Sequence, residues 1–107
     1  MLIRQGMMWK QGKIVKNWKH RYFVLLKTST PGLELRYFHR PESSLPKGVV
    51  KITKYTCTLT MGVHGNRRYL EVRVPGRTYY MHSTSSSELE GWYNDLRQAI
   101  TDLPGRR

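Results

Sequence analysis

The residues of this chain that could do chemistry are concentrated in one stretch near the N-terminus, residues 10–26. Its cations are two or three residues apart with no acid between them, namely Lys10, Lys13, Lys16, Lys19 and Arg21. Positive charges held together in a hairpin repel one another, so they favour an anionic ligand. The chemistry predicted for this stretch is therefore anion binding.

The elements that must position these cations are predicted to be seven short strands. Each run is rich in Val, Ile, Thr, Tyr and Phe, and turn residues separate it from the next. The expected strands are Arg4–Lys10, Trp18–Lys27, Leu33–His39, Gly48–Lys54, Cys57–Met61, Arg68–Val74 and Thr78–His82. Gly62 to Asn66 is expected to be a turn, and Pro75-Gly76 a tight hairpin.

After the last strand the hydrophobic period changes from two to between three and four residues. The apolar stripe consists of Leu89, Trp92, Tyr93, Leu96, Ala99, Ile100 and Leu103. Ser85 with Glu88, or Ser87 with Glu90, could form a capping box before it, and Pro104 follows it. We expect an amphipathic helix from about Ser86 to Leu103, anchored by Trp92.

These elements predict one mainly β domain spanning residues 1–107. Its expected architecture is a seven-stranded, bent antiparallel sandwich or barrel, capped at an open end by the C-terminal helix. At 107 residues the chain is long enough for one hydrophobic core. It opens on patterned sequence without a signal peptide, and its start at Met1 leads us to expect a domain at the N-terminus of a larger protein.

Strand alternation divides the cationic stretch into two groups. Lys19 and Arg21 share a face with the core residue Phe23, and Lys10 shares one with Met8. Tyr37 follows Leu35 in the same way on the third strand. We therefore expect three adjacent strands to present Lys10, Lys19, Arg21 and Tyr37 at one mouth of the barrel. Inward cations without acids would be costly to desolvate unless an anion fills the mouth.

The second group lies on the turn of the hairpin. Ile14 and Val15 are flanked by Lys13 and Lys16, which suits shallow insertion into a membrane interface while the lysines contact anionic lipid. Two alternatives remain open: the lysines could form a solvated face, and Ile14-Val15 could fold over the barrel edge. We predict Lys13, Ile14 and Val15 as membrane contacts.

Several motifs together resemble the pleckstrin homology (PH) domain over almost the whole chain. They are Gly6-x-Met8-x-Lys10, then, after eight residues, Lys19-x-Arg21-x-Phe23 preceded by Trp18, and later Leu35-x-Tyr37-Phe38 and Trp92. The signature of lysine, gap and Lys-x-Arg-x-hydrophobic is similar to that of the members that bind 3-phosphorylated inositides. The resemblance implies that Lys10, Lys19, Arg21 and Tyr37 contact the headgroup, with Lys16 as an extra phosphate ligand.

The same resemblance implies a further basic ligand near the fourth strand. Lys47 and Lys51 are the candidates. Val50 and Ile52 fit the core face of that strand, which turns Lys51 outward. We therefore prefer Lys47, since a residue at the end of a loop is freer to reach the mouth.

Charge and composition exclude other classes of protein. The net charge is +12, and twelve cations against two acids give residues 1–54 a net +10, while seven against five give residues 55–107 only +2. This asymmetry is typical of proteins that orient toward a negative surface. The single Cys57 excludes an internal disulfide and is expected to be a half-buried apolar residue, and the four scattered His show no metal-ligand spacing. We expect no cofactor, no metal and no enzymatic activity.

Three functions compete on these grounds. The leading prediction is a phosphoinositide-binding module, for phosphatidylinositol 3,4,5-trisphosphate or 3,4-bisphosphate, that is cytoplasmic and recruited peripherally to the anionic leaflet of the plasma membrane. The alternative is a protein or phosphopeptide module on the same superfold, with a peptide beside the helix and only nonspecific lipid binding. A nucleic-acid partner is the least supported, because no recognisable stacking platform accompanies the charge.

Overall fold

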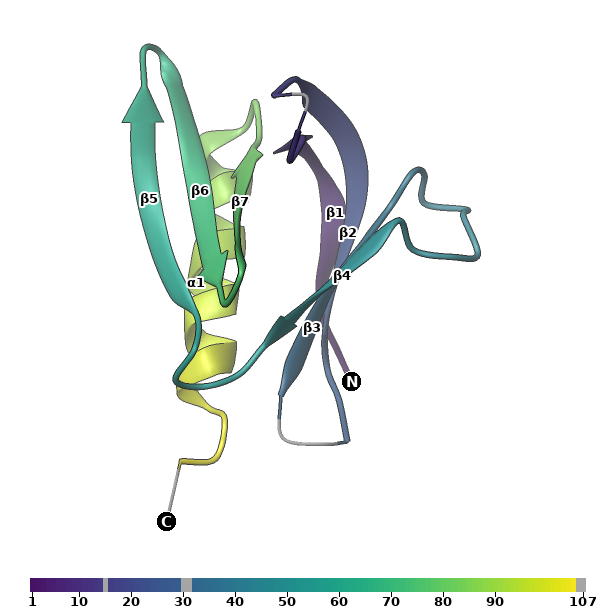
Figure 1. The fold of residues 1–107 in the computed structure, drawn as a ribbon, viewed down its shortest axis with the longest axis vertical. Helices are drawn as coiled ribbons and strands as arrows, with labels where there is room; N and C mark the ends of the chain where they lie inside the picture. The colour runs from purple at the N-terminus through teal and green to yellow at the C-terminus, as the bar shows by residue number, and fades with distance from the viewer. Residues whose placement is uncertain (15, 30–31, 106–107) are drawn as a thin grey trace.

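The structure is a computed structural model that describes residues 1–14, 16–29 and 32–105. Its elements, in chain order, are β1 (Leu2–Gln11), β2 (Trp18–Lys27), β3 (Leu33–Phe38), β4 (Gly48–Ile52), β5 (Thr58–His64), β6 (Arg67–Val74), β7 (Arg77–His82) and α1 (Ser86–Thr101). This is the predicted number and order of elements. All pairings between neighbouring strands are antiparallel (Figure 1).

The seven strands form one sheet in the order β4-β3-β2-β1-β7-β6-β5, so β4 and β5 are its two edges. The sheet bends between β1 and β7, which are paired only through Trp9 with His82 and Lys10 with Met81 among the described residues. Figure 1 shows the two halves facing each other, with α1 against the β5–β7 half. The predicted bent, helix-capped sandwich is thereby confirmed, and the sheet is unclosed.

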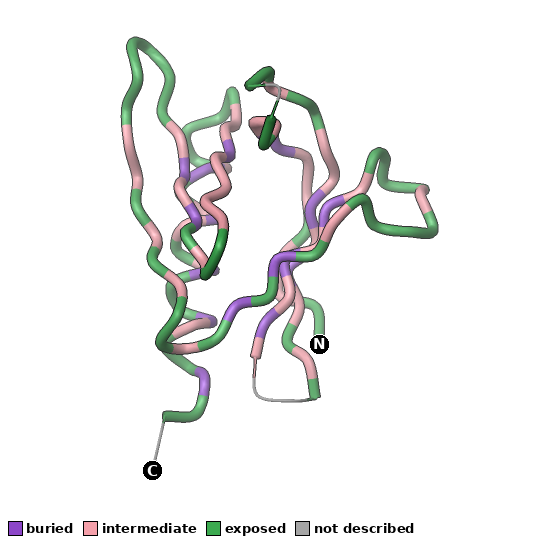
Figure 2. The backbone as a smooth tube through the Cα atoms, in the orientation of Figure 1, coloured by how far each residue is buried: buried purple, intermediate pink, exposed green. Residues whose placement is uncertain are grey.

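The core lies between the two halves of the sheet and the helix, where the buried positions of Figure 2 alternate along the strands. Met8, Phe23, Leu35 and Val72 are inward positions of four strands, and Trp92 enters from the helix, fully buried. Burial of such side chains typically stabilises a fold by about 1.5–3 kcal/mol each. Trp92 is thus the anchor that the helical stripe predicts.

Several boundaries differ from those predicted. The turn expected at Gly62 to Asn66 is shorter, because β5 continues to His64 and β6 begins at Arg67. Gly65 has a φ of 61°, which suits glycine and allows the chain to reverse within two residues. The Pro75-Gly76 hairpin is confirmed, since Val74 pairs with Arg77. The helix ends at Thr101, two residues before the predicted end.

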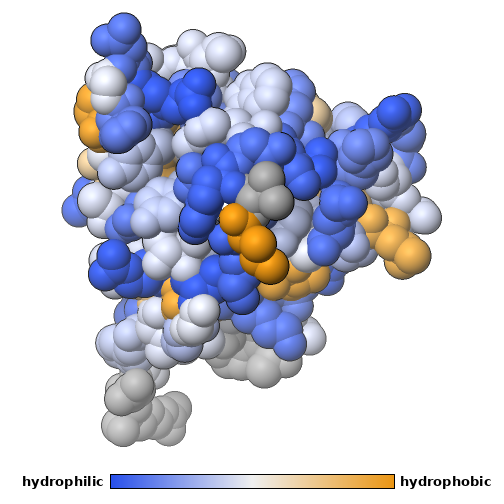
Figure 3. Space-filling model, turned by 45° about the horizontal axis from the view of Figure 1, so that its top comes forward, coloured by the Kyte–Doolittle hydropathy of each residue, from blue (hydrophilic) through white to orange (hydrophobic). Residues whose placement is uncertain are grey.

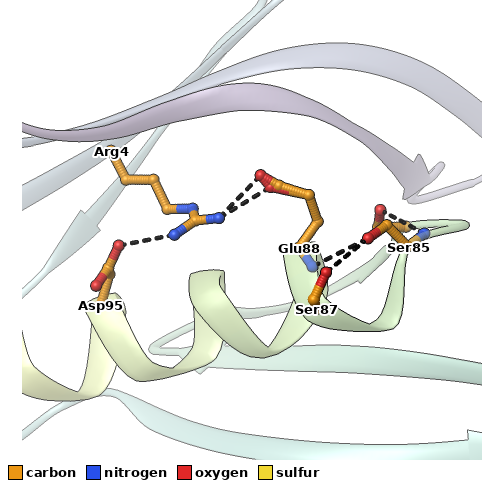
Figure 4. A network of polar contacts seen from close by, with 6 residues as sticks. Arg4, Ser85, Ser87, Glu88 and Asp95 are labelled. Atoms are coloured by element: carbon orange, nitrogen blue, oxygen red, sulfur yellow. Dashed lines mark hydrogen bonds and ion pairs between the residues drawn. The ribbon is translucent and has the colours of Figure 1, made fainter.

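Helix α1 begins with half of the predicted capping box. The Ser85 hydroxyl accepts a hydrogen bond from the backbone N–H of Glu88 at 3.2 Å, as expected of an N-cap. The Glu88 carboxylate does not return to Ser85, because it accepts two hydrogen bonds from Arg4 on β1, each 2.9 Å long (Figure 4). The residue that would close the box instead joins the helix to the sheet.

Arg4 holds the helix through a second carboxylate, and we call Arg4, Glu88 and Asp95 the Arg4 clamp. Its other terminal nitrogen donates to Asp95, about two helical turns beyond Glu88, at 3.0 Å. The guanidinium also lies 5.4 Å from the ring centre of Trp92. A Cβ at Gly91 would approach it to 2.6 Å, so the clamp requires the absence of a side chain there. The sequence did not predict this contact.

Candidate anion-binding site

The candidate site is the mouth between the first three strands and β7. Lys10 and Lys19 are directly paired across β1 and β2, and Met8 is paired with Arg21 two residues further along. Phe23 in turn pairs with Tyr37 on β3, which carries the inward face to a third strand. The structure therefore brings Lys10, Lys19, Arg21 and Tyr37 to one region, as alternation predicts.

Lys10 is the centre of this site. It is 8% exposed, and its ammonium lies 4.7 Å from the ring centre of Tyr37 and 5.8 Å from that of Tyr79. Its hydrogen bond is to the backbone carbonyl of Gln11, at 3.4 Å. Burial, followed by the positive charges of Arg77, Arg21 and Lys19, lowers the pKa of Lys10 from 10.5 to about 8. A buried ammonium among three cations is electrostatically incomplete without an anion.

Arg77 is the member of the site that sequence reasoning missed. Its guanidinium stacks on Tyr79 at 4.2 Å from the ring centre, and its Nε is buried with no hydrogen-bond acceptor among the described residues. The predicted strand began at Thr78, which left Arg77 in a turn. The alternation that places Met81 and Tyr79 inward also predicts an inward Arg77 if it is extended two residues toward the start of the strand.

Arg21 is held at the surface of the mouth. One terminal nitrogen donates to the carbonyl of His20 at 2.9 Å and lies 3.5 Å from Nδ1 of His39. No carboxylate of the described chain pairs with it. These contacts fix part of the guanidinium and leave its other N–H groups able to grip a phosphate.

Tyr37 has a clear packing role. It is buried between Phe23, 5.9 Å away, and Tyr79, 6.4 Å away, measured between ring centres. Its ring and hydroxyl cross over Gly48, where an added Cβ would come within 2.1 Å of the hydroxyl. A role for its hydroxyl as a hydrogen-bond donor to a phosphate stays a prediction.

The remaining candidates lie around the mouth. Lys47 is exposed, and its backbone N–H donates to the carbonyl of Tyr37 at 2.8 Å, so it borders the site. Lys51 is exposed on the edge strand opposite Glu34, as predicted. Lys13, Ile14 and Lys16 are exposed on the β1–β2 hairpin. Val15, a predicted membrane contact, lies outside the described residues.

Two groups have no role in the site. Burial raises the pKa of the Cys57 thiol to about 11, so it is a packed apolar group and a poor nucleophile. His20 turns away from the mouth and stacks on Trp9 with 4.6 Å between ring centres. Among the described residues, no group of three His, Cys, Asp or Glu could hold a metal ion.

Comparison with known proteins identifies the family of this fold. A family model described as "PH domain" matches residues 2–101. The chain belongs to the PH domain family. The PH fold is a non-catalytic binding module, and its members bind phosphoinositides or proteins. The helix of this PH domain, within the described residues, is too short and polar to cross a bilayer.

Relatives and solved structures agree with this assignment. The chain is 32% identical over 100 residues to "Arf-GAP with dual PH domain-containing protein 2" of Rattus norvegicus, covering 90% of the chain and 26% of that protein. It is 28% identical to the "Dual adapter for phosphotyrosine and 3-phosphotyrosine and 3-phosphoinositide" of Homo sapiens, covering 94% of the chain and 34% of that protein. The chain thus spans about a quarter to a third of these curated relatives.

The C-terminal PH domain of pleckstrin is a structural neighbour. Its complex with D-myo-Ins(1,2,3,4,5)P5 superposes with a TM-score of 0.76 at 27% identity, over 92% of this chain and 98% of that one. A second complex, with D-myo-Ins(1,2,3,5,6)P5, gives a TM-score of 0.80 at 25% identity, over 94% and 96%. Both neighbours are thus PH domains with a bound inositol phosphate.

Proposed function

We propose that this PH domain binds a phosphoinositide headgroup at the cationic mouth and is thereby recruited to the anionic cytoplasmic face of the plasma membrane. The observation that carries the proposal is that Lys10 is buried beside Arg77, Arg21 and Lys19, with no acid in the described part of the chain to balance them. A compact ligand with several phosphates neutralises all four cations at once, which a single carboxylate cannot do.

Each side chain has a distinct role in this proposal. Arg21 binds a ring phosphate through two N–H groups, Lys10 and Lys19 flank it as point charges, and Arg77 supplies its unpaired Nε–H. Tyr37 lies beneath the inositol ring and donates a hydrogen bond from its hydroxyl to a phosphate. Lys47 and Lys16 reach the ligand from the border of the site.

We further propose that the preferred headgroups are phosphatidylinositol 3,4,5-trisphosphate and 3,4-bisphosphate. Two findings support this preference. The Lys10, Lys19 and Arg21 pattern is in place at the mouth, and the name of the dual adapter relative assigns a 3-phosphoinositide to that protein.

Calorimetry with a panel of soluble inositol phosphates tests the site. Arg21→Ala should lower the affinity for the preferred ligand by about 100-fold, because it removes a bidentate charged contact that contributes about 3 kcal/mol. The matched control is Arg36→Ala, which removes the same charge from β3 at a residue already paired with Glu34 at 2.7 Å.

Two outcomes would reject the proposal. One is an affinity and selectivity of Arg21→Ala equal to those of Arg36→Ala. The other is a phosphopeptide that shifts the resonances of Leu89–Ile100 while inositol phosphates shift none, which would favour the protein-recognition alternative.

A further inference from the structure

The side of the β1–β4 half that faces away from the core is unusually apolar. Met8, Phe23 and Leu35 point into the core, so the residues that alternate with them on the same strands point away from it. We call this surface the outer face, and its apolar members on β1–β3 are Met7, Trp9, Tyr22, Val24, Leu26 and Phe38, each half-buried. The solvated face of an antiparallel sheet is normally polar, so this one indicates a contact surface.

The register of the strands joins these residues into one patch. Met7 pairs with Tyr22, which pairs in turn with Phe38, and 6.4 Å separates the ring centres of Tyr22 and Phe38. Trp9 extends the patch along β1, and Val24 extends it along β2. Figure 1 shows helix α1 against the other half of the sheet, so the helix does not cover this patch. Aromatic residues and Met are the types that protein interfaces favour.

The polar groups of the outer face are already paired with one another. The Tyr22 hydroxyl donates a hydrogen bond to the side-chain carbonyl of Gln5 at 2.6 Å. Arg36 forms an ion pair with Glu34 at 2.7 Å. Burying the outer face against another protein therefore leaves none of these groups without a partner, which avoids the main cost of burying polar side chains.

The charge of the outer face indicates a second copy of this chain as its occupant. The chain carries a net charge of +12, so two copies repel one another across most of their surfaces. On the outer face of β1–β3, the charged residues are Arg36 and Glu34, which cancel. An acidic partner would instead be attracted to the cationic mouth. The outer face is thus a surface on which two like-charged copies can meet with little added repulsion.

The arrangement of the patch fits two-fold symmetry. An axis parallel to β2 would place each row of cross-strand residues against the same row of the other copy, with β2 on β2 and β1 on β3. Val24 would then meet its own counterpart, and Met7 would meet Phe38 of the other copy. Apolar rows cover apolar rows in this arrangement.

The same axis points both mouths in one direction. Figure 1 shows the β1–β2 hairpin at one end of the long axis, so the outer face lies along the side of the molecule. Figure 3, with that end turned forward, shows a mostly hydrophilic surface on which hydrophobic side chains are scattered. The apolar contact surface is therefore separate from the end that carries the mouth, and two copies paired by their sides can bind one membrane.

We propose that this chain forms a symmetric homodimer through the outer face, so that two mouths bind two headgroups on one membrane. The role of the dimer at the membrane rests on the proposed function, whereas the contact itself does not. Once one mouth is bound, binding of the second is intramolecular, so the dimer binds a membrane more tightly than either mouth alone.

Sedimentation equilibrium of the chain without lipid tests the contact. The mass should rise from 12.6 kDa toward twice that value as the concentration approaches about 1 mM, the order of effective concentration at which tethered sites meet. Val24→Glu should stay monomeric, because it places two carboxylates against each other at the axis. The matched control is Thr58→Glu, which adds the same charge at an exposed residue of β5 opposite Arg73 and should dimerise like the wild type.

Two results in solution would overturn the proposal. One is a wild-type chain that stays monomeric at about 1 mM, and the other is equal dimerisation of Val24→Glu and Thr58→Glu. NMR spectra of the wild type locate the contact without any variant. Their concentration-dependent shifts should be confined to outer-face residues such as Tyr22, Val24 and Phe38, and shifts confined to α1 would contradict the assignment.

Vesicles that contain phosphatidylinositol 3,4,5-trisphosphate test the consequence for membrane binding. Val24→Glu should bind them about 10- to 100-fold more weakly than Thr58→Glu, because it loses the second mouth. Both variants should keep the wild-type affinity for a soluble inositol phosphate, which also shows that they fold. Equal binding of the two variants to vesicles would overturn the role of the dimer at the membrane.

Arg21→Ala separates this proposal from the function of the mouth. It should lose headgroup binding and still dimerise in solution. A dimer that binds no headgroup in its wild-type form would reject the mouth alone. A wild-type chain that binds its headgroup but stays monomeric would reject the dimer alone.

Discussion

The two ends of strand β1 carry inward-facing positive charges with opposite surroundings. Arg4 and Lys10 lie on the same inward face of the strand, separated by Gly6 and Met8. At one end Arg4 meets two carboxylates of the helix, Glu88 and Asp95 (Figure 4). At the other end Lys10 meets two aromatic rings and three further cations.

This difference teaches how to separate structural from functional charge in a small basic domain. The Arg4 clamp is internally balanced, so it contributes to stability whether or not a ligand is present. The mouth is unbalanced, so part of its electrostatic energy is released only when an anion binds. Removing a charge should therefore cost stability at the clamp and affinity at the mouth.

The largest expected effect is that of Lys10→Met. We expect the affinity for the preferred inositol phosphate to fall by about 10- to 100-fold, because a hydrogen bond to a charged group contributes about 1.5–3 kcal/mol. The free protein should gain stability, on the order of 1–3 kcal/mol at pH 7, because its folded state disfavours the ammonium. Calorimetry and urea unfolding measure the two quantities.

Lys19→Met is the control for this variant, since Lys19 is the exposed cross-strand partner of Lys10. It should lose affinity without gaining stability. If Lys10→Met were only as stable as the wild type, the result would contradict the claim that the charge of Lys10 destabilises the free protein.

The opposite outcome is expected for Arg4→Met. The free energy of unfolding should fall by about 1–3 kcal/mol, because the change removes a partly buried ion pair with two acids and the packing of Arg4 on Trp92. Inositol phosphate affinity should stay within twofold of the wild type, about 0.4 kcal/mol. Arg68→Met, which breaks the more exposed pair with Glu90, is the control and should lose less stability.

The pH dependence of binding sharpens the comparison. Lys10 must be protonated to bind a phosphate, and its pKa in the free protein is about 8. Affinity should therefore fall as the pH rises above 8, by at most about tenfold, or 1.4 kcal/mol, per pH unit. Lys10→Arg should remove this dependence, because arginine stays charged, and a wild-type affinity that is flat up to pH 10 would contradict the assignment.

The stability of the free protein should change with the opposite sign over the same range. The pKa of Lys10 is lower in the folded state than its ordinary value of 10.5, so between pH 8 and 10.5 the unfolded chain holds a proton that the folded chain has lost. Stability contributed by this group therefore rises with pH there. The difference between wild type and Lys10→Met in urea unfolding isolates it.

The smallest expected effect is that of Glu88→Gln. It weakens one arm of the clamp, but the carboxylate is 46% exposed and the second arm to Asp95 remains. We expect a loss of about 0.5–1 kcal/mol in thermal unfolding, reduced by high salt. Glu90→Gln should have a smaller effect still, and a reversal of this order would show that the clamp has no special role.

Most of the fold, and the inward positions of the mouth, could be predicted from local sequence patterns. Alternation in β1 and β2 was sufficient to place Lys10 and Arg21 inward, because one face of each strand is buried and the period is two. The three- to four-residue spacing of the stripe around Trp92 was likewise sufficient for the helix. Each of these predictions depends only on residues near one another in sequence.

Contacts between distant segments could not be predicted in this way. Arg4 and Glu88 are 84 residues apart, and no local pattern indicates that they meet. Arg77 was missed because a strand boundary was placed one residue late. The pocket that Trp18, Arg67 and His82 line depends on β2, β6 and β7 meeting, which requires the sheet order.

The bend of the sheet has a consequence for how a ligand acts on the whole domain. Among the described residues, the two halves of the sheet are joined by two residue pairs between β1 and β7, so this seam is the line along which the strands separate most easily. Lys10 lies on one side of the seam and Arg77 on the other. A headgroup held by both side chains, as proposed above, would therefore tie the two halves of the sheet together and stabilise the sandwich.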